Sequence, residues 1–129
     1  MAEFMLRILN KADHQLEWPE EKHRQFLKSC ETYIGELKRN GNLISAQPLI
    51  REGHIISGSQ GNWKISPFRE TQEVQVGYYH LLAKNMEEAL ELAKKNPEFE
   101  FSTSARIEVR PIKTKEVTTG FVYPKKAEV

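Results

Sequence analysis

The 129-residue chain has only one cysteine, Cys30, so no disulfide can form within it. No apolar run approaches the ~20 residues that a membrane-spanning helix needs. The first residues also lack the basic segment and the long apolar segment of a secretory signal peptide. From these absences we expect a soluble, cytoplasmic protein that does not associate with membranes.

An excess of charge of one sign is lacking too, because 19 Lys and Arg residues face 18 Asp and Glu residues, for a net charge of +1. Proteins that bind duplex nucleic acids gain most of their affinity from clustered basic side chains that neutralise phosphates. Basic residues gather here only in the tail, at Lys113, Lys115, Lys125 and Lys126. We therefore expect no direct binding of nucleic acid.

Metal and phosphate motifs are missing as well. The four histidines, His14, His23, His54 and His80, show no His-x-x-x-His or Cys–His spacing, so no zinc site is predicted. The glycine-rich residues 58–61 have neither the Lys-Ser/Thr ending nor the following helix of a phosphate loop. We predict no metal and no cofactor, and we expect His14 and His23 to be solvated.

The length fits one domain of about 100 to 150 residues. A chain of this size buries roughly two thirds of its unfolded surface, so its core needs no disulfide or metal. We place the domain at residues 1–112 and a C-terminal extension at 113–129. Within the extension, residues 117–123 either add an edge strand or stay mobile.

Two segments have helical patterns. The sequence predicts a helix over residues 19–39, because Pro19 suits the first turn and Asn40-Gly41 suits the end. A second helix is predicted over residues 86–96 and ended by Asn96-Pro97. The apolar stripe of the first helix comprises Phe26, Cys30, Tyr33, Ile34 and Leu37, and that of the second comprises Ala89, Leu90 and Ala93.

The remaining segments favour strands. Strands are predicted at residues 4–9, 43–50, 74–82 and 106–112, and a hairpin at 54–57 and 63–65. Pro48 indicates an edge or a bulge in the second strand. Alternation in the strand at 74–82 places Val74, Val76, Tyr78 and His80 together on one face.

The order β, α, β, hairpin, β, α, β predicts an α+β protein of the ferredoxin-like type, with helices on one face of an antiparallel sheet. The other face would carry Arg7, Glu108 and Arg110. Such a face is either wet or lines a cavity shared with a second copy.

Four separated motifs resemble those of the YCII-related (DGPF-type) family. The run PFRETQE at residues 67–73 with VGYY at 76–79 is similar to the family's DGPF(A)ETKE…GGYY segment. NMEEALE at 85–91, Asn96-Pro97 and IEVRPI at 107–112 match its later segments. Ile65 and Ser66 stand where the family has Asp and Gly, and Gln72 replaces its Lys. The resemblance extends over residues 4–112.

The resemblance implies a ferredoxin-like fold that pairs sheet to sheet into a homodimeric α/β barrel. One branch of the family carries a His–Asp pair that suggests an enzyme. In this sequence the histidine position falls on Cys30 and the aspartate position falls on Asn96. The other branch is associated with alternative sigma factors, which implies a role in transcription initiation.

The candidate ligand-binding residues are polar or aromatic and come from the motif strand, from the segment before it and from the first and last predicted strands: Arg7, Phe68, Glu70, Glu73, Tyr78, His80 and Arg110. Glu73, Tyr78, His80 and Arg110 would line the barrel cavity and bind a small polar ligand. Alternatively, Glu70 and Glu73 cap backbone amides or pair with Arg110. Cys30 is expected to be a small buried apolar residue, because a nucleophilic thiol needs an electropositive, partly open setting.

These observations predict a small-molecule-binding homodimer with weak or vestigial enzymatic activity. The alternative is an accessory module that binds another protein, linked to transcription initiation. In that case residues 117–123 offer an apolar edge to the partner.

Overall fold

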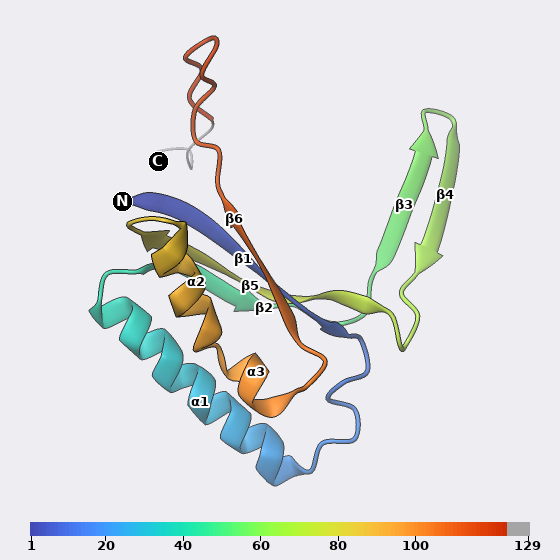
Figure 1. Cartoon of the computed structure of the whole chain (residues 1–129). Helices are drawn as coiled ribbons and strands as arrows, with labels where there is room; N and C mark the ends of the chain where they lie inside the picture. Colours follow the sequence, from blue (N-terminus) through green and yellow to red (C-terminus); the bar gives the residue numbers. More distant parts are fainter. Residues whose placement is uncertain (124–129) are drawn as a thin grey trace, which may run out of the picture.

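The computed structural model describes residues 1–123 of the chain (Figure 1). Four antiparallel strands form the main sheet in the order β2-β5-β1-β6, and the helices lie against one of its faces (Figure 1). This arrangement confirms the predicted α+β class and is compatible with a ferredoxin-like fold. The elements are β1 (Ala2–Lys11), α1 (Glu20–Arg39), β2 (Leu43–Pro48), β3 (His54–Ser59), β4 (Asn62–Pro67), β5 (Glu73–Ala83), α2 (Met86–Lys94), α3 (Pro97–Phe101) and β6 (Arg106–Pro111).

The helix predicted over 19–39 is confirmed as α1, with Pro19 at its N-cap position. Gly41 follows its C-terminus with a φ of 72°, a left-handed conformation that favours glycine. The second predicted helix is shorter than expected, because α2 ends at Lys94 and a new short helix, α3, begins at Pro97. Asn96 therefore lies in the short link between the two helices, and its side chain caps α3.

The predicted face pattern of the strand at 74–82 is wrong. Gly77 lies opposite Ile8 of β1, but Leu9 lies opposite Gln75, so Val76 is an extra residue in β5. Such a bulge shifts the alternation by one residue. Val74 and Val76 are consequently buried against the helices, whereas Tyr78 and His80 lie on the opposite face of the sheet.

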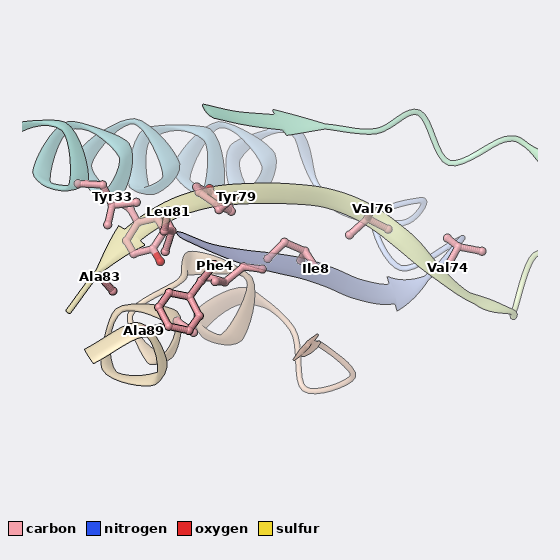
Figure 2. Close-up of a cluster of buried hydrophobic side chains, with 12 residues drawn as sticks. Phe4, Ile8, Tyr33, Val74, Val76, Tyr79, Leu81, Ala83 and Ala89 are labelled. Atoms are coloured by element: carbon pink, nitrogen blue, oxygen red, sulfur yellow. The ribbon is translucent and has the colours of Figure 1, made fainter. Parts of the chain in front are cut away.

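The core lies between the sheet and the helices (Figure 2). The predicted face of β1 is confirmed, because Phe4, Leu6 and Ile8 are buried there. Leu6 and Leu81 on neighbouring strands are 0% exposed. Burial of apolar side chains is the main force that holds a helix layer on a sheet. The remaining core residues are Tyr33, Leu37, Val74, Val76, Tyr79, Ala83, Ala89 and Ala93.

The predicted hairpin is confirmed as a separate two-stranded sheet, β3–β4, which extends away from the main sheet (Figure 1). Ile56 pairs with Ile65, and Gly58 pairs with Trp63, so these residues share one face of the hairpin. The side chains of Ile56, Trp63 and Ile65 are exposed. The hairpin thus presents an unpartnered apolar face within the described part of the chain.

Both edges of the main sheet are short strands. The edge position predicted for the strand containing Pro48 is confirmed, because β2 pairs only with β5 and ends at this proline. At the other edge, β6 ends at Pro111. Residues 117–123 do not extend the sheet there; Lys115 and Val122 instead form an isolated bridge in a small loop of their own. The last part of the predicted extension, residues 124–129, lies outside the described residues.

Candidate functional site

A cavity of about 840 Å³ lies between α1 and the β2–β5 side of the sheet. We call it the α1–sheet cavity. It is larger than three other hollows in the described part of the chain, which have volumes of about 420, 540 and 620 Å³ and lie among more exposed side chains. Its apolar lining comprises Ile8, Phe26, Leu27, Ile34, Ala46, Pro48, Val76 and Tyr79, and its polar lining includes Cys30, Arg51, Asn96 and Glu98.

The amphipathic spacing of α1 places one wall of the cavity. Phe26, Cys30 and Ile34 recur four residues apart, so they follow one another along the same side of the helix. The β5 bulge forms part of the opposite wall through Val76 and Gly77. A side-chain carbon at position 77 would lie 3.1 Å from the Gln47 carbonyl oxygen, so glycine allows β2 to approach closely here.

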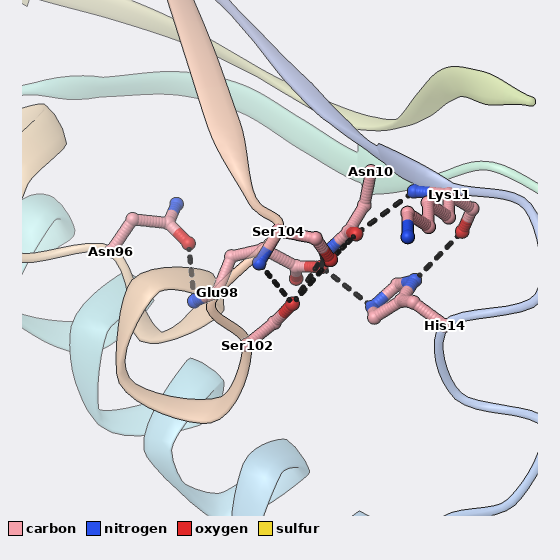
Figure 3. Close-up of polar contacts among 7 residues, drawn as sticks. All are labelled: Asn10, Lys11, His14, Asn96, Glu98, Ser102 and Ser104. Atoms are coloured by element: carbon pink, nitrogen blue, oxygen red, sulfur yellow. Dashed lines mark hydrogen bonds and ion pairs between the residues drawn. The ribbon is translucent and has the colours of Figure 1, made fainter.

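Asn96 lies at the junction of α2 and α3. Its Oδ1 accepts a hydrogen bond of 2.9 Å from the backbone N–H of Glu98, which caps α3. Asn96 is only 4% exposed, and its Nδ2 has no hydrogen-bond partner among the described residues. Figure 3 shows this nitrogen pointing away from α3. The Asn96 side chain also lies near the Tyr33 and Tyr79 hydroxyl groups, where it partly offsets the effect of burial on their pKa values. No contact of Nδ2 within residues 1–123 has hydrogen-bond geometry, so a buried amide donor without a well-formed hydrogen bond lies at the cavity wall.

Glu98 anchors a buried polar network that joins α3 to the end of β1 (Figure 3). Its Oε1 accepts a hydrogen bond of 3.1 Å from Asn10 Nδ2 and lies 2.8 Å from His14 Nε2. The His14 contact is close enough for an ion pair, although its angle does not meet hydrogen-bond geometry. Both side chains are almost fully buried, with 4% exposure for His14 and 6% for Glu98.

The imidazole of His14 joins the end of β1 to α3. His14 Nδ1 lies 3.1 Å from the Lys11 carbonyl oxygen, which can only accept a hydrogen bond, so the ring donates from Nδ1. The other ring nitrogen, Nε2, faces the Glu98 carboxylate on α3.

The burial of His14 corrects the expectation that it is solvated. The prediction placed His14 correctly in a loop, but that loop folds back over α3, where Glu98 and the Lys11 carbonyl contact the ring. Trp18 also packs edge-on against the imidazole at 5.7 Å. His23, by contrast, is exposed on α1 as expected.

Arg51 follows β2 and contributes the other unpaired donor. Its Nε is shielded from solvent and has no hydrogen-bond partner among residues 1–123. Burial lowers the pKa of its guanidinium group, and the charge of Glu98 opposes this effect only in part. The cavity thus holds a cation whose solvation is incomplete.

Cys30 is half-buried and faces the cavity, rather than being a fully buried apolar residue. Burial, together with the charge of Glu98, raises the pKa of its thiol to about 11. A reactive cysteine needs a lowered pKa, because the thiolate is the nucleophile. Burial likewise raises the pKa of Tyr33 to about 12 and also raises that of Tyr79. These groups stay protonated near neutral pH.

Four of the predicted ligand-binding residues lie on the sheet face away from the helices, which we call the open face: Arg7, Tyr78, His80 and Arg110. Their polar groups largely contact neighbours on the sheet. Arg7 donates to Gln75 Oε1 at 3.0 Å and to Glu108 Oε1 at 3.1 Å. His80 Nε2 lies 2.7 Å from Glu3 Oε1, and the Tyr78 hydroxyl lies 3.2 Å from Ser45 Oγ.

The other three predicted residues lie elsewhere. Phe68 packs against the core, and its ring lies where a side chain at Gly53 would be. The Glu70 backbone carbonyl accepts from the Asp13 N–H at 3.0 Å. The Glu73 carboxylate accepts two hydrogen bonds, of 2.8 and 2.5 Å, from Arg106 rather than from Arg110.

Comparison with models of known protein families gives no match to this chain, and comparison with curated proteins gives none either. The resemblance to the YCII-related family therefore stays a prediction. Within residues 1–123, no helix has the length and apolar content needed to cross a membrane. In the same range, no three His, Cys, Asp or Glu side chains gather closely enough to hold a metal ion.

Proposed function

We propose that this protein is a YCII-related, small-molecule-binding homodimer whose ligand occupies the α1–sheet cavity. The observation that carries the proposal is the cavity itself, which has about 840 Å³ of space, a mainly apolar lining and two unpaired buried donors. Ligand pockets typically have volumes of about 300 to 1,000 Å³ and combine apolar walls with a few polar groups.

The unpaired donors support binding rather than a purely structural role. A buried donor without a partner destabilises a protein by about 1 to 3 kcal/mol. Both Arg51 Nε and Asn96 Nδ2 are in this state among the described residues. A ligand with acceptor oxygens would restore both hydrogen bonds, so ligand binding would also stabilise the fold.

Weak or vestigial catalysis at this site would have to use groups other than a Cys30 thiolate. The two positions that correspond to the family's His–Asp pair, Cys30 and Asn96, both line the cavity. A thiol with a pKa of about 11 is protonated at neutral pH and cannot serve as a general base there. Binding is thus the better-supported activity of this site.

The homodimer would form through the open face. In the single chain its charged side chains include Arg7, which is 39% exposed, and Glu108, which is 38% exposed. Arg7 and Glu108 already pair with one another, whereas Arg110 is 71% exposed and lies 3.9 Å from the same Glu108 oxygen. A second sheet that covers this face would therefore have to provide a partner for Arg110 or leave its guanidinium group in water. Light scattering after size-exclusion chromatography should give twice the mass of the chain, and a monomer mass at high protein concentration would refute this part.

The site can be tested with a thermal-shift screen against a metabolite library, run on the wild-type protein and on Ala46→Phe. Ala46 lines the cavity from β2, so a phenyl ring at this position should fill the space. A ligand at a hundredfold its dissociation constant adds about 2.7 kcal/mol of stability. We expect ligands that stabilise the wild type and not the filled variant.

Equal stabilisation of both proteins would place binding elsewhere and contradict the proposal. If Ala46→Phe does not fold, as judged by circular dichroism, Ala46→Leu provides a smaller filling group. Ile55→Phe is the matched control, since Ile55 is 48% exposed on β3 and lies outside the cavity.

The second candidate function is an accessory protein-binding module linked to transcription initiation. The β3–β4 hairpin favours it, because Trp63 is 59% exposed and Ile65 is 62% exposed on the same apolar face. Exposed apolar patches of this kind commonly mark contact surfaces. Binding to a purified sigma factor that is lost in Trp63→Ser and Ile65→Ser would support this function, and the absence of such binding in the wild type would exclude it.

A further inference from the structure

The buried polar atoms left unpaired at the α1–sheet cavity are all of one kind. Arg51 Nε and Asn96 Nδ2 are nitrogen donors. Among residues 1–123, no buried side-chain oxygen is without a hydrogen-bond partner. A ligand that complements this wall must therefore bring acceptor oxygens rather than donor groups.

Among the described residues, the charges around the cavity leave the Arg51 guanidinium without a direct ion-pair partner. The charge of Glu98 opposes the effect of burial on the Arg51 pKa only in part, and the Glu98 Oε1 atom contacts Asn10 and His14 instead. Of the exposed charges that also line the cavity, Glu31 and Lys38 offset each other. Arg51 remains, and it has no ion-pair partner within hydrogen-bonding distance in the described part of the chain.

We propose that the ligand is a small monocarboxylic acid with an apolar body. The carboxylate would bind to the Arg51 guanidinium, and the Asn96 amide would donate to a ligand oxygen. The apolar body would lie against Phe26, Ile34 and Val76. This inference rests on the proposed function, since it names the chemical class that the same cavity accepts.

The chemistry of the guanidinium group supports a carboxylate over other anions and over cations. A guanidinium presents its donors in a planar fork that matches the two oxygens of a carboxylate. One Arg51 charge balances one carboxylate, whereas a phosphate with two charges would carry an unpaired charge into a mainly apolar space. An amine would add a second buried positive charge and an excess of donors.

The test compares three probes of similar size: phenylacetate, phenylacetamide and phenethylamine. Isothermal titration calorimetry of the full-length protein should show phenylacetate binding at least tenfold more tightly than phenylacetamide, and no binding of phenethylamine. Octanoate serves as a second carboxylate with a flexible apolar body. Binding of both acids should be lost in the cavity-filled Ala46→Phe variant.

Two variants isolate the proposed contacts. Arg51→Met removes the charge and keeps most of the side-chain length. It should therefore weaken the binding of phenylacetate at least tenfold and leave the affinity for phenylacetamide nearly unchanged. Asn96→Asp keeps the oxygen that caps α3 but replaces the amide donor with an acceptor oxygen. It should therefore also weaken the binding of phenylacetate. Arg39→Met is the matched control at an exposed arginine outside the cavity, and it should change neither affinity.

The outcomes separate this inference from the proposed function. If phenylacetate and phenylacetamide bind equally well and both lose binding in Ala46→Phe, the inference of a carboxylic acid is wrong and the cavity is still a ligand site. The same conclusion follows if the library ligands that depend on the cavity contain no carboxylate. If no ligand of any class distinguishes the wild type from Ala46→Phe, both the inference and the proposed function are wrong.

Discussion

Replacing Asn10 with alanine should destabilise the protein more than the loss of a single polar side chain usually does. Asn10 is 0% exposed on the helix-facing side of β1. Its Nδ2 donates to Glu98 Oε1 and Ser102 Oγ, both at 3.1 Å. Its Oδ1 accepts from the Lys11 N–H at 2.8 Å and from Ser104 Oγ at 2.6 Å.

The expected magnitude follows from these four hydrogen bonds. Each contributes a net of about 1 kcal/mol, and a water molecule in the vacated space could replace some of them. We therefore expect Asn10→Ala to lower the free energy of unfolding by about 2 to 4 kcal/mol. Small domains have about 5 to 15 kcal/mol in total, so this is a large share.

Urea denaturation followed by circular dichroism measures the loss, and Asn85→Ala provides a matched control. Asn85 is exposed and makes one capping bond, in which its Oδ1 accepts from the Glu88 N–H at 2.9 Å. Loss of such a cap costs about 1 kcal/mol. If Asn10→Ala destabilises the protein no more than Asn85→Ala does, the buried network does not join β1 to α3 as described.

Three further outcomes are expected. Alkylation of Cys30 by iodoacetamide, followed by intact mass spectrometry, should be slow at pH 7 and reach half its maximal rate near pH 11, because only the thiolate reacts. A half-maximal rate near the ordinary value of 9.0 would contradict the raised pKa. Gly35→Ala should raise the free energy of unfolding by about 0.5 to 1 kcal/mol, because alanine favours the helix α1 and the added methyl group meets only Arg39 Nη1, at 3.9 Å. A loss of stability would mean that the methyl group does not fit at this position. Leu6→Ala should lower the free energy of unfolding by about 2 to 5 kcal/mol, because Leu6 is 0% exposed; a change under 1 kcal/mol would mean that the core is not packed around it.

The sequence predicted the elements whose ends carry strong local signals. Residues 19–39 begin at a proline and end before Asn40-Gly41, and α1 has nearly these bounds. The faces of β5 were not predictable by alternation, because the count assumes a regular strand and Val76 is an extra residue. Gly77 was the available sign, since a glycine inside a strand often accompanies a bulge.

The site was predictable in part. Cys30 and Asn96 were singled out by the resemblance, and both line the α1–sheet cavity. Arg51, Glu98 and His14 were missed because they are far apart in the sequence and share no spacing. One signal was present for the helix alone: Asn96-Pro97-Glu98 has a cap, a proline and an acid in the order typical of a helix start, which predicts α3. The burial of Glu98 depends on Asn10 and His14, which are distant in the sequence.

The prolines at the sheet edges limit how this protein can meet another chain. β2 and β6 have only six residues each, and Pro48 and Pro111 lack the N–H that an incoming strand would need at their ends. A ladder of backbone hydrogen bonds could not run far along either edge. Edge-to-edge addition of strands from other molecules, which builds fibrils, is thereby disfavoured. A neighbouring molecule is directed toward the broad surface of the sheet instead.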